Sequence, residues 1–334
     1  MTLRASPTNR PQGIDLEALA DGCCDRLAAS YASRGMIASP TPVPLIEVQH
    51  EAGGVVTLWV QVPPEMVSDY NPGQYFMCWN PYDATGGMSR PNYHSEKPYS
   101  VGDVKIDRTG VDEGIAADTG GEGRALLGFT VKDLGRQSGE LTRMKAGDWL
   151  AIRGPFGTSF PRMSSGDRLL LVSGGIGSTP MHMAARDGRR KLGDNLKIDA
   201  IMGFRNEAEC HFISRMEALC DSLTITTDDG SSGTPGFPTG PLPNLLSGVG
   251  EGDREEGGSG RTVLLTCGPE PMMKAVLQMA VDAGVECYAA MERYLPCSVA
   301  MCGLCMVGDK LTCVDGPVME GGWLLQQDDF GLSH

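Results

Sequence analysis

The sequence predicts an antiparallel β-barrel followed by an α/β domain with a parallel sheet, and a small cysteine-rich lobe at the C-terminus. The length of 334 residues suits two compact domains plus an appendage. Short strands give way to alternating strands and helices near residue 166, and four cysteines cluster near the end. We expect an N-terminal extension over 1–40, the barrel over 41–165, the α/β domain over 166–290, and the cysteine segment with a tail over 291–334.

The first half of the chain predicts one helix and then strands. Apolar residues recur at helical spacing from Leu16 to Tyr31, which predicts a surface helix in the extension. From about residue 41, short apolar runs separated by Gly and Pro turns are typical of a barrel, and LIEVQHEAGGVVTLWVQV predicts a hairpin. The Gly- and Asp-rich run from Asp107 to Gly123 predicts an exposed loop between two strands.

Strands and helices alternate from about residue 166 to 290. The predicted strands are RLLLVSGG, LKIDAIMGFR, SLTITTDDG and RTVLLTCGP, and the helices between them include STPMHMAARDGRRKLG, SRMEALCDS and EPMMKAVLQMAVDAG. This alternation indicates a parallel sheet with crossover helices. The stretch 238–260 is rich in Gly, Pro and acidic residues, so we predict a mobile loop there.

Composition excludes several classes of function. The net charge of −14 disfavours nonspecific nucleic-acid binding, which needs a basic surface. No stretch approaches the roughly 18–20 apolar residues of a membrane span, and the N-terminus MTLRASPTNRPQG has no apolar signal region. Eleven cysteines without a signal peptide argue against a disulfide scaffold. We therefore expect a cytoplasmic location, no nucleic acid and no membrane span.

The cysteines Cys297, Cys302, Cys305 and Cys313 form the pattern C-x4-C-x2-C-x7-C. The first three have the plant-type spacing for [2Fe-2S] ligation, with the fourth ligand later in the chain. Two alternatives are a structural zinc site, whose usual pattern is two C-x2-C knuckles, and four unrelated buried thiols.

Two further segments indicate a nucleotide crevice. After the strand RLLLVS comes the turn GGIGSTPM, where glycines let the backbone approach a pyrophosphate and a helix N-terminus favours its charge. A turn of this kind alone is weak evidence. The segment LLTCGPEPMM follows another strand, and ligands bind at the carboxyl ends of parallel strands, so both loops should border one crevice. The candidate residues are Gly174, Gly175, Gly177, Ser178, Thr179, Cys267, Gly268 and Pro269.

The order KPYS, GGIGSTPM, CGPEPMM and C-x4-C-x2-C, over roughly residues 41–320, resembles the ferredoxin–NADP reductase superfamily. The chain resembles more closely the electron-transfer subunits of class 1B dihydroorotate dehydrogenase. The segment VDGPVM after Cys313 also resembles the ending of those subunits. The resemblance implies a six-stranded antiparallel FAD barrel, a domain for NAD(H), with NADP(H) not excluded, and a [2Fe-2S] lobe that faces a partner.

The resemblance also implies FAD contacts. Lys97, Pro98, Tyr99 and Ser100 match the family motif Arg-x-Tyr/Phe-Ser, in which the aromatic ring lies against the flavin and the cation meets the pyrophosphate. Lys in place of Arg keeps the charge but loses the bidentate fork. The turn Leu134-Gly135-Arg136-Gln137-Ser138 resembles V-G-x-G-T, which cradles the FAD pyrophosphate, with Gln137 where a second Gly is usual. Gly135 and Ser138 are therefore further candidates.

Two other positions are compared with the family. Asp229 lies in the turn Asp228-Asp229-Gly230-Ser231, which matches a recurrent family turn near the ribose; the alternative is a solvated acidic turn. Ser298 and Ala300 stand where family members often carry Gly, which such loops use where φ must be positive. We interpret both as tolerated variation.

The implied function is electron transfer between NAD(H), FAD, a [2Fe-2S] cluster and the FMN-containing catalytic subunit of dihydroorotate dehydrogenase, in a hetero-oligomer of pyrimidine biosynthesis. The cofactors supply the chemistry, so no acid–base constellation of side chains is required. The alternatives are a NAD(P)H-dependent reductase subunit of another complex, such as a hydrogenase or a sulfur- or ferredoxin-linked oxidoreductase, and a degenerate subunit without redox function.

Overall fold

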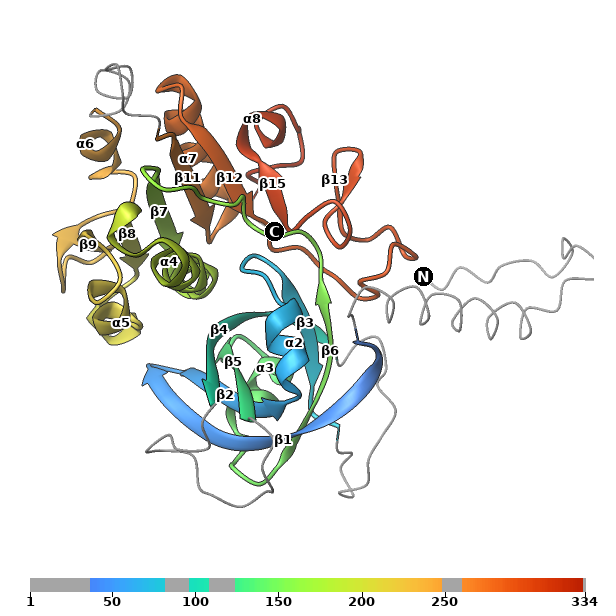
Figure 1. Cartoon of the computed structure of the whole chain (residues 1–334). Helices are drawn as coiled ribbons and strands as arrows, with labels where there is room; N and C mark the ends of the chain where they lie inside the picture. Colours follow the sequence, from blue (N-terminus) through green and yellow to red (C-terminus); the bar gives the residue numbers. More distant parts are fainter. Residues whose placement is uncertain (1–36, 82–95, 108–123, 248–259, 333–334) are drawn as a thin grey trace, which may run out of the picture.

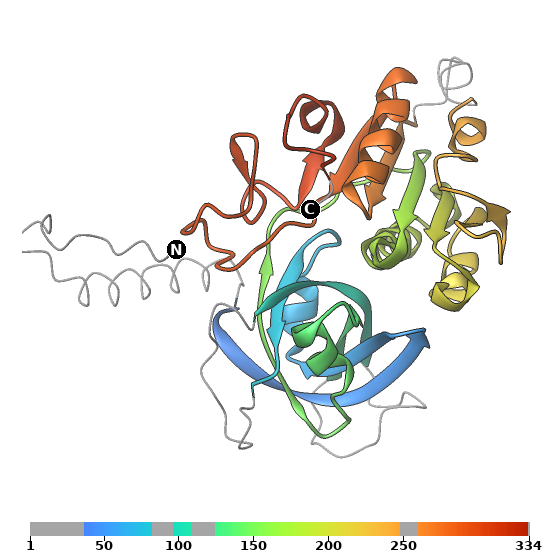
Figure 2. The ribbon, with the colours of Figure 1, turned by 180° about the vertical axis from the view of Figure 1, so that it is seen from behind.

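The computed structural model describes residues 37–81, 96–107, 124–247 and 260–332. It contains a β-barrel and an α/β domain that lie against each other, with the C-terminal segment beside both (Figure 1, Figure 2). The predicted helix of the N-terminal extension and the predicted loop from Asp107 to Gly123 lie outside the described residues, apart from Asp107 itself, which ends a strand.

Six strands close the barrel in the order β1-β2-β5-β4-β3-β6, and every neighbouring pair is antiparallel. This confirms the predicted barrel, and β1 with β2 forms the predicted hairpin. The strands are β1 (Ile37–Ala52), β2 (Val55–Val62), β3 (Tyr75–Trp79), β4 (Lys97–Asp107), β5 (Arg124–Lys132) and β6 (Trp149–Phe156). Two short helices connect them, α2 (Pro64–Asp69) and α3 (Arg136–Thr142).

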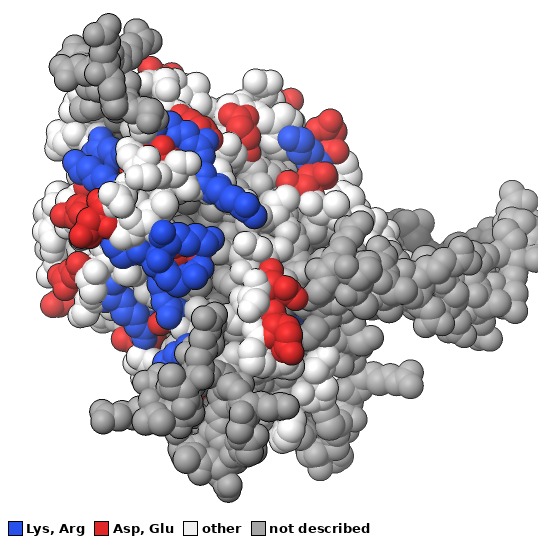
Figure 3. Space-filling model, in the orientation of Figure 1, with Lys and Arg blue, Asp and Glu red and all other residues white. Residues whose placement is uncertain are grey.

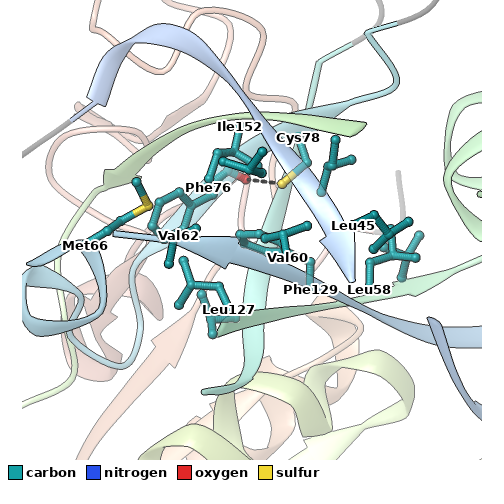
Figure 4. Close-up of a cluster of buried hydrophobic side chains, with 14 of the residues drawn as sticks. Leu45, Leu58, Val60, Val62, Met66, Phe76, Cys78, Leu127, Phe129 and Ile152 are labelled. Carbon is teal, nitrogen blue, oxygen red and sulfur yellow. Dashed lines mark hydrogen bonds between the residues drawn. The ribbon is translucent and has the colours of Figure 1, made fainter. Parts of the chain in front are cut away.

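Apolar side chains from all sides fill the barrel (Figure 4). Leu45, Leu58 and Leu127 are among the fully buried residues, and the rings of Phe76 and Phe129 meet edge to face with centroids 5.4 Å apart. A small barrel needs side chains of this size to fill its interior, because the strands leave no room for solvent. This core supports β3 and β4, and the N-terminal residues of both strands line the candidate site.

The α/β domain has a seven-stranded sheet in the order β10-β9-β8-β7-β11-β12-β15, in which only β15 runs antiparallel to its neighbour. The predicted parallel sheet is confirmed. Its strands are β7 (Arg168–Gly174), β8 (Lys197–Phe204), β9 (Ser222–Thr227), β10 (Thr234–Pro235), β11 (Thr262–Cys267), β12 (Glu286–Ala290) and β15 (Val318–Glu320). The helical segments are η1 (Gly175–Gly177), α4 (Ser178–Leu192), η2 (Gly193–Asn195), η3 (Glu207–Glu209), α5 (Ile213–Glu217), α6 (Leu242–Leu246), α7 (Glu270–Asp282) and α8 (Gly321–Leu324).

The central strand β7 shows why the sheet is covered on both faces. Leu169 and Leu171 pack into the core on one face, whereas Leu170 and Val172 pack into the core on the other. A continuous apolar run of this kind is typical of a parallel strand between two layers of helices, because successive side chains point to opposite faces.

The predicted loop over 238–260 is partly wrong. Residues 248–259 lie outside the described residues, but Leu242–Leu246 forms the helix α6. Leu242 and Leu246 are four residues apart, so they share one face and are buried in the same core as α7. The Gly- and Pro-rich composition masked this short amphipathic pattern.

The C-terminal segment leaves the sheet and returns to it. Residues 291–317, which we call the cysteine lobe, run between β12 and β15 and contain the hairpin of β13 (Met306–Val307) and β14 (Lys310–Leu311). After β15 and α8, Phe330 is fully buried in the core that also contains α7. The tail thus packs on the α/β domain, and our division of the chain into domains remains a proposal.

Lys and Arg side chains gather on the face of the molecule where α4 lies (Figure 3). The last turn of α4 carries Arg189, Arg190 and Lys191, whose positive charges interact favourably with the negative end of the helix dipole. Each also pairs with a carboxylate: Arg189 with Asp194 and Asp221, and the other two with Asp187. Among the described residues, no helix is long and apolar enough to cross a membrane.

Candidate functional site

A cavity of about 420 Å³ lies between the barrel and the α/β domain. Its size and its place between two domains are typical of small-molecule and cofactor sites. Its lining brings together the predicted motifs KPYS, LGRQS, GGIGSTPM and CGP. The barrel contributes Gly73, Tyr75, Lys97, Pro98, Tyr99, Ser100, Thr130, Lys132, Leu134, Gly135, Arg136, Gln137 and Ser138; the rest of the chain contributes Ile176, Thr179, Pro180, Cys267, Ala290, Met291, Glu292, Arg293, Leu295 and Pro317.

The KPYS motif forms the start of β4, in antiparallel register with β3. Burial, and then the neighbouring Cys78, raise the pKa of the Tyr99 hydroxyl far above its usual range. The phenol is therefore neutral, and Tyr99 lines the cavity. Lys97 Nζ lies 4.6 Å from the centroid of the Tyr294 ring, so the cation also contacts the cysteine lobe.

The turn Leu134–Ser138 leads from β5 into α3 and borders the cavity. The Ser138 hydroxyl accepts a hydrogen bond from the Leu134 N–H (2.9 Å) and donates one to the Gly135 carbonyl (3.2 Å). Its hydroxyl thus closes the turn. No heavy atom lies within 4 Å of the place where a Cβ of Gly135 would stand, so this part of the turn is open to a ligand.

The turns GGIG and CGP are locked against each other. A Cβ on Gly177 would stand 2.2 Å from the Cys267 carbonyl oxygen, and one on Gly268 would stand 2.9 Å from backbone atoms of Gly174. We expected Gly177 to make room for a pyrophosphate. In the structure it makes room for the neighbouring loop, because two strand ends of the sheet converge here.

The two hydroxyls that follow this turn have different surroundings. Burial lowers the pKa of His211, so its ring is neutral; Nδ1–H donates to the Glu209 carbonyl (2.9 Å), and Nε2 accepts from the Ser178 hydroxyl (2.7 Å). Ser178 is therefore engaged inside the protein. Thr179 lines the cavity, and its buried Oγ1 has no hydrogen-bond partner among the described residues, as expected of a group that meets a ligand.

Asp229 lies apart from the cavity, in an exposed turn after β9. Its pKa is held below the usual range by hydrogen bonds from the hydroxyl and the backbone N–H of Ser231, at 2.6 and 2.9 Å. Its position at the carboxyl end of a parallel strand suits contact with a nucleotide that extends beyond the cavity. That contact stays a prediction.

Several cavity residues were not predicted from the sequence. Tyr75 begins β3, Thr130 lies within β5, and Leu295 comes from the cysteine lobe. Apolar alternation marks such residues as strand or core positions, but it carries no signal that they face a ligand. Only closure of the barrel brings them together.

The four predicted metal ligands form two pairs. Cys297 lies within hydrogen-bonding reach of Cys302, and Cys305 of Cys313. All four are free thiols, of which only Cys302 is exposed. Two pairs suit a bridged two-iron centre, where each iron needs two thiolates besides its sulfides. Within the described residues, no group of three or more His, Cys, Asp or Glu is arranged to hold a single metal ion.

The loop favours the thiolate at Cys297, whereas burial raises the pKa of the Cys302 and Cys313 thiols. Ser298 and Ala300 both have positive φ values, 56° and 60°, so the positions where the family often has Gly keep a left-handed backbone despite their side chains. Burial alone would raise the pKa of Cys297, but hydrogen bonds from backbone N–H groups of the loop, including that of Val299, bring it below its usual range. Amide groups turned toward one point form an anion-binding nest, as in many iron–sulfur sites.

The chain is similar in sequence to known electron transfer subunits. The chain is 32% identical over 265 residues to a probable dihydroorotate dehydrogenase B (NAD(+)) electron transfer subunit of Methanocaldococcus jannaschii, which covers 79% of this chain and 84% of that protein. It is 35% identical over 197 residues, 58% of this chain and 73% of that protein, to the corresponding Clostridium perfringens subunit. A search against protein-family models finds no match.

Solved structures share the fold. An NADH-dependent reduced ferredoxin-NADP oxidoreductase superposes with a TM-score of 0.62 at 23% identity, over 86% of this chain and 89% of that one. The cytochrome b5 reductase domain of Ulva prolifera nitrate reductase superposes with a TM-score of 0.52 at 19% identity, over 74% of this chain and 94% of that domain.

We predict that Gly177→Ala destabilises the protein, because even one methyl group would overlap the Cys267 carbonyl. Overpacking of this kind costs about 1–3 kcal/mol. Urea denaturation of the purified variant measures this cost. Gly135→Ala is the matched control: its φ is extended and its Cβ position is open, so its stability should be unchanged. Equal stability of both variants would contradict the locked-turn interpretation.

Proposed function

Because this chain belongs to the electron transfer subunits of dihydroorotate dehydrogenase B, we propose that it passes electrons between NAD(H), FAD, one [2Fe-2S] cluster and a partner. The partner is the FMN-containing catalytic subunit, in a hetero-oligomer. The residues that hold each cofactor are part of the proposal, as is a cytoplasmic location.

One observation supports this proposal more than any other. Tyr75 and Leu295 line the cavity and also belong to the same buried cluster as Cys305 and Cys313. A single layer of packed side chains therefore separates the candidate flavin site from two of the candidate iron ligands. Close packing leaves no solvent between the two sites, which suits electron transfer over a short distance.

The cavity residues suit FAD and a nicotinamide. When bound, FAD takes up a hydride from the nicotinamide and releases electrons one at a time, and the cluster carries single electrons. Tyr99 would flank the flavin ring with its neutral aromatic face, and Lys97 would offset phosphate charge. Thr179 would supply a hydrogen bond with its unpartnered Oγ1. The backbone of the two locked turns would border the nicotinamide nucleotide, with NADP(H) not excluded.

The exposed end of the cysteine lobe suits a partner surface. The side chains around Cys302 include Met301, Leu304 and Met306, which are 65%, 61% and 47% exposed. Contiguous exposed apolar side chains usually mark protein interfaces, and Met adapts its shape to a partner. We propose that the catalytic subunit docks here, where the fewest atoms would separate the two proteins' redox centres.

We predict about two irons and two acid-labile sulfides per chain, because four paired thiolates match one [2Fe-2S] cluster. Cys302→Ser should remove the cluster's visible absorption. Cys220→Ser is the control, since Cys220 lies in the α/β domain near the end of α5 and should leave iron and sulfide unchanged. Finding zinc without labile sulfide would refute the cluster.

We predict that Tyr99→Ala weakens FAD retention or shifts the flavin spectrum, because aromatic stacking contributes roughly 0.5–1.5 kcal/mol beyond its buried area. Tyr99→Phe keeps the ring and should retain FAD. Flavin content after gel filtration and the visible spectrum measure both effects. An unchanged spectrum and FAD content in Tyr99→Ala would place the flavin elsewhere.

The proposed function is tested by measuring NADH oxidation through the flavin and electron transfer through the cluster to the partner separately. Cys305→Ser removes one cluster ligand, so NADH oxidation with a small artificial acceptor that meets the flavin directly should persist, while coupling to the catalytic subunit should fail. Both rates are measured side by side on the purified subunit and on the reconstituted complex. If the variant loses both activities while FAD stays bound, electrons do not follow the proposed order.

A further inference from the structure

A buried ion pair joins the barrel to the cysteine lobe. Arg153 on β6 and Glu96, immediately before β4, are only 8% and 6% exposed. Arg153 Nε and Nη2 donate to the same oxygen of Glu96, at 3.1 and 2.6 Å. Charged side chains are almost never buried to this degree unless they are paired.

The guanidinium has a second contact, on the side of the lobe. Arg153 Nη2 also donates to the backbone carbonyl of Cys297, at 3.1 Å. Its Cζ lies 5.2 Å from the ring centroid of Phe156, which is buried in one cluster with Cys305 and Cys313. The positive end of the ion pair therefore touches the cysteine loop.

Stability alone does not account for this pair. Removing two charges from water costs about as much as their attraction returns, so buried ion pairs contribute little net stability. A backbone carbonyl is also a weak reason to bury a guanidinium. The pair of Arg293 with Glu270 is buried to a similar degree, but the pair of Arg153 with Glu96 places its guanidinium against the carbonyl of a candidate cluster ligand.

We propose that Arg153 is a positioning residue that anchors the Cys297 loop and raises the reduction potential of the cluster, with Glu96 partly offsetting that effect. This proposal rests on the proposed function. Reduction adds one electron to the cluster and breaks no bond, so it increases the negative charge beside Arg153. A buried positive charge stabilises the reduced form, because the low dielectric screens it little, and net charge and hydrogen bonds tune such clusters.

The test uses two variants with opposite expected signs. Glu96→Gln keeps an acceptor for Arg153 but removes the negative charge, so the midpoint potential of the cluster should rise. Arg153→Gln removes the positive charge and leaves Glu96, so the potential should fall. Potentials are measured on the purified full chain with its cluster, by titration with dithionite monitored by electron paramagnetic resonance.

Arg153→Lys is the conservative control, which should keep a potential close to that of the unmodified protein because the charge remains. A merely structural role would loosen the loop in both Gln variants and shift both potentials in the same direction. That result, or no shift in either, would overturn the proposal. If Arg153→Gln fails to keep its cluster, Glu96→Gln still decides: an unchanged or lowered potential contradicts the inference.

Failure of this inference differs from failure of the proposed function. If the unmodified protein holds no iron and labile sulfide, the proposed function fails and this inference fails with it. If the unmodified protein holds the cluster and its potential is measurable, only the response of the variants is at issue.

Discussion

The cysteine lobe is held in place by side chains of the barrel, and the arrangement of the site depends on that contact. Tyr75, Met77 and Phe156 from β3 and β6 form one buried cluster with Leu295 and two of the cysteines. Because these strands also support the start of β4, the surface that binds the lobe and the wall of the cavity are two sides of the same part of the barrel. A displacement of either strand would move both.

The connections of the chain reinforce this contact. The lobe leaves the sheet after β12 and returns as β15, so both of its ends are fixed in the α/β domain. The segment after β6 is tied to the returning chain, since the Thr158 N–H donates to the Gly316 carbonyl (2.6 Å) and its hydroxyl to the Val318 carbonyl (3.0 Å). These bonds tie the segment after the barrel to the chain that returns from the lobe to the sheet.

Hydrogen bonds made by polar side chains also link the elements at this junction. The Ser178 hydroxyl at the start of α4 donates to His211, and the His182 Nδ1 lies 2.8 Å from the Gly102 carbonyl, joining α4 to β4. Burial lowers the pKa of both histidines, so neither adds charge to the interior. The buried guanidinium of Arg153 contacts the Cys297 carbonyl, which is why we infer an electrostatic role for it.

The sequence by itself determined the two fold classes, the order of the motifs and the spacing of the four clustered cysteines, but not how those cysteines pair. Strand periodicity, Gly-rich turns and cysteine spacing are local patterns, and they remain readable in the unfolded chain. It did not reveal α6 within a Gly- and Pro-rich stretch, nor the reason for Gly177, whose neighbour Cys267 is far along the chain. The contact of Arg153 with Glu96 spans 57 positions, and its contact with Cys297 spans 144. Only the closed barrel and the return of the chain to the sheet decide such contacts, because they depend on how strands pair and not on the residues between them.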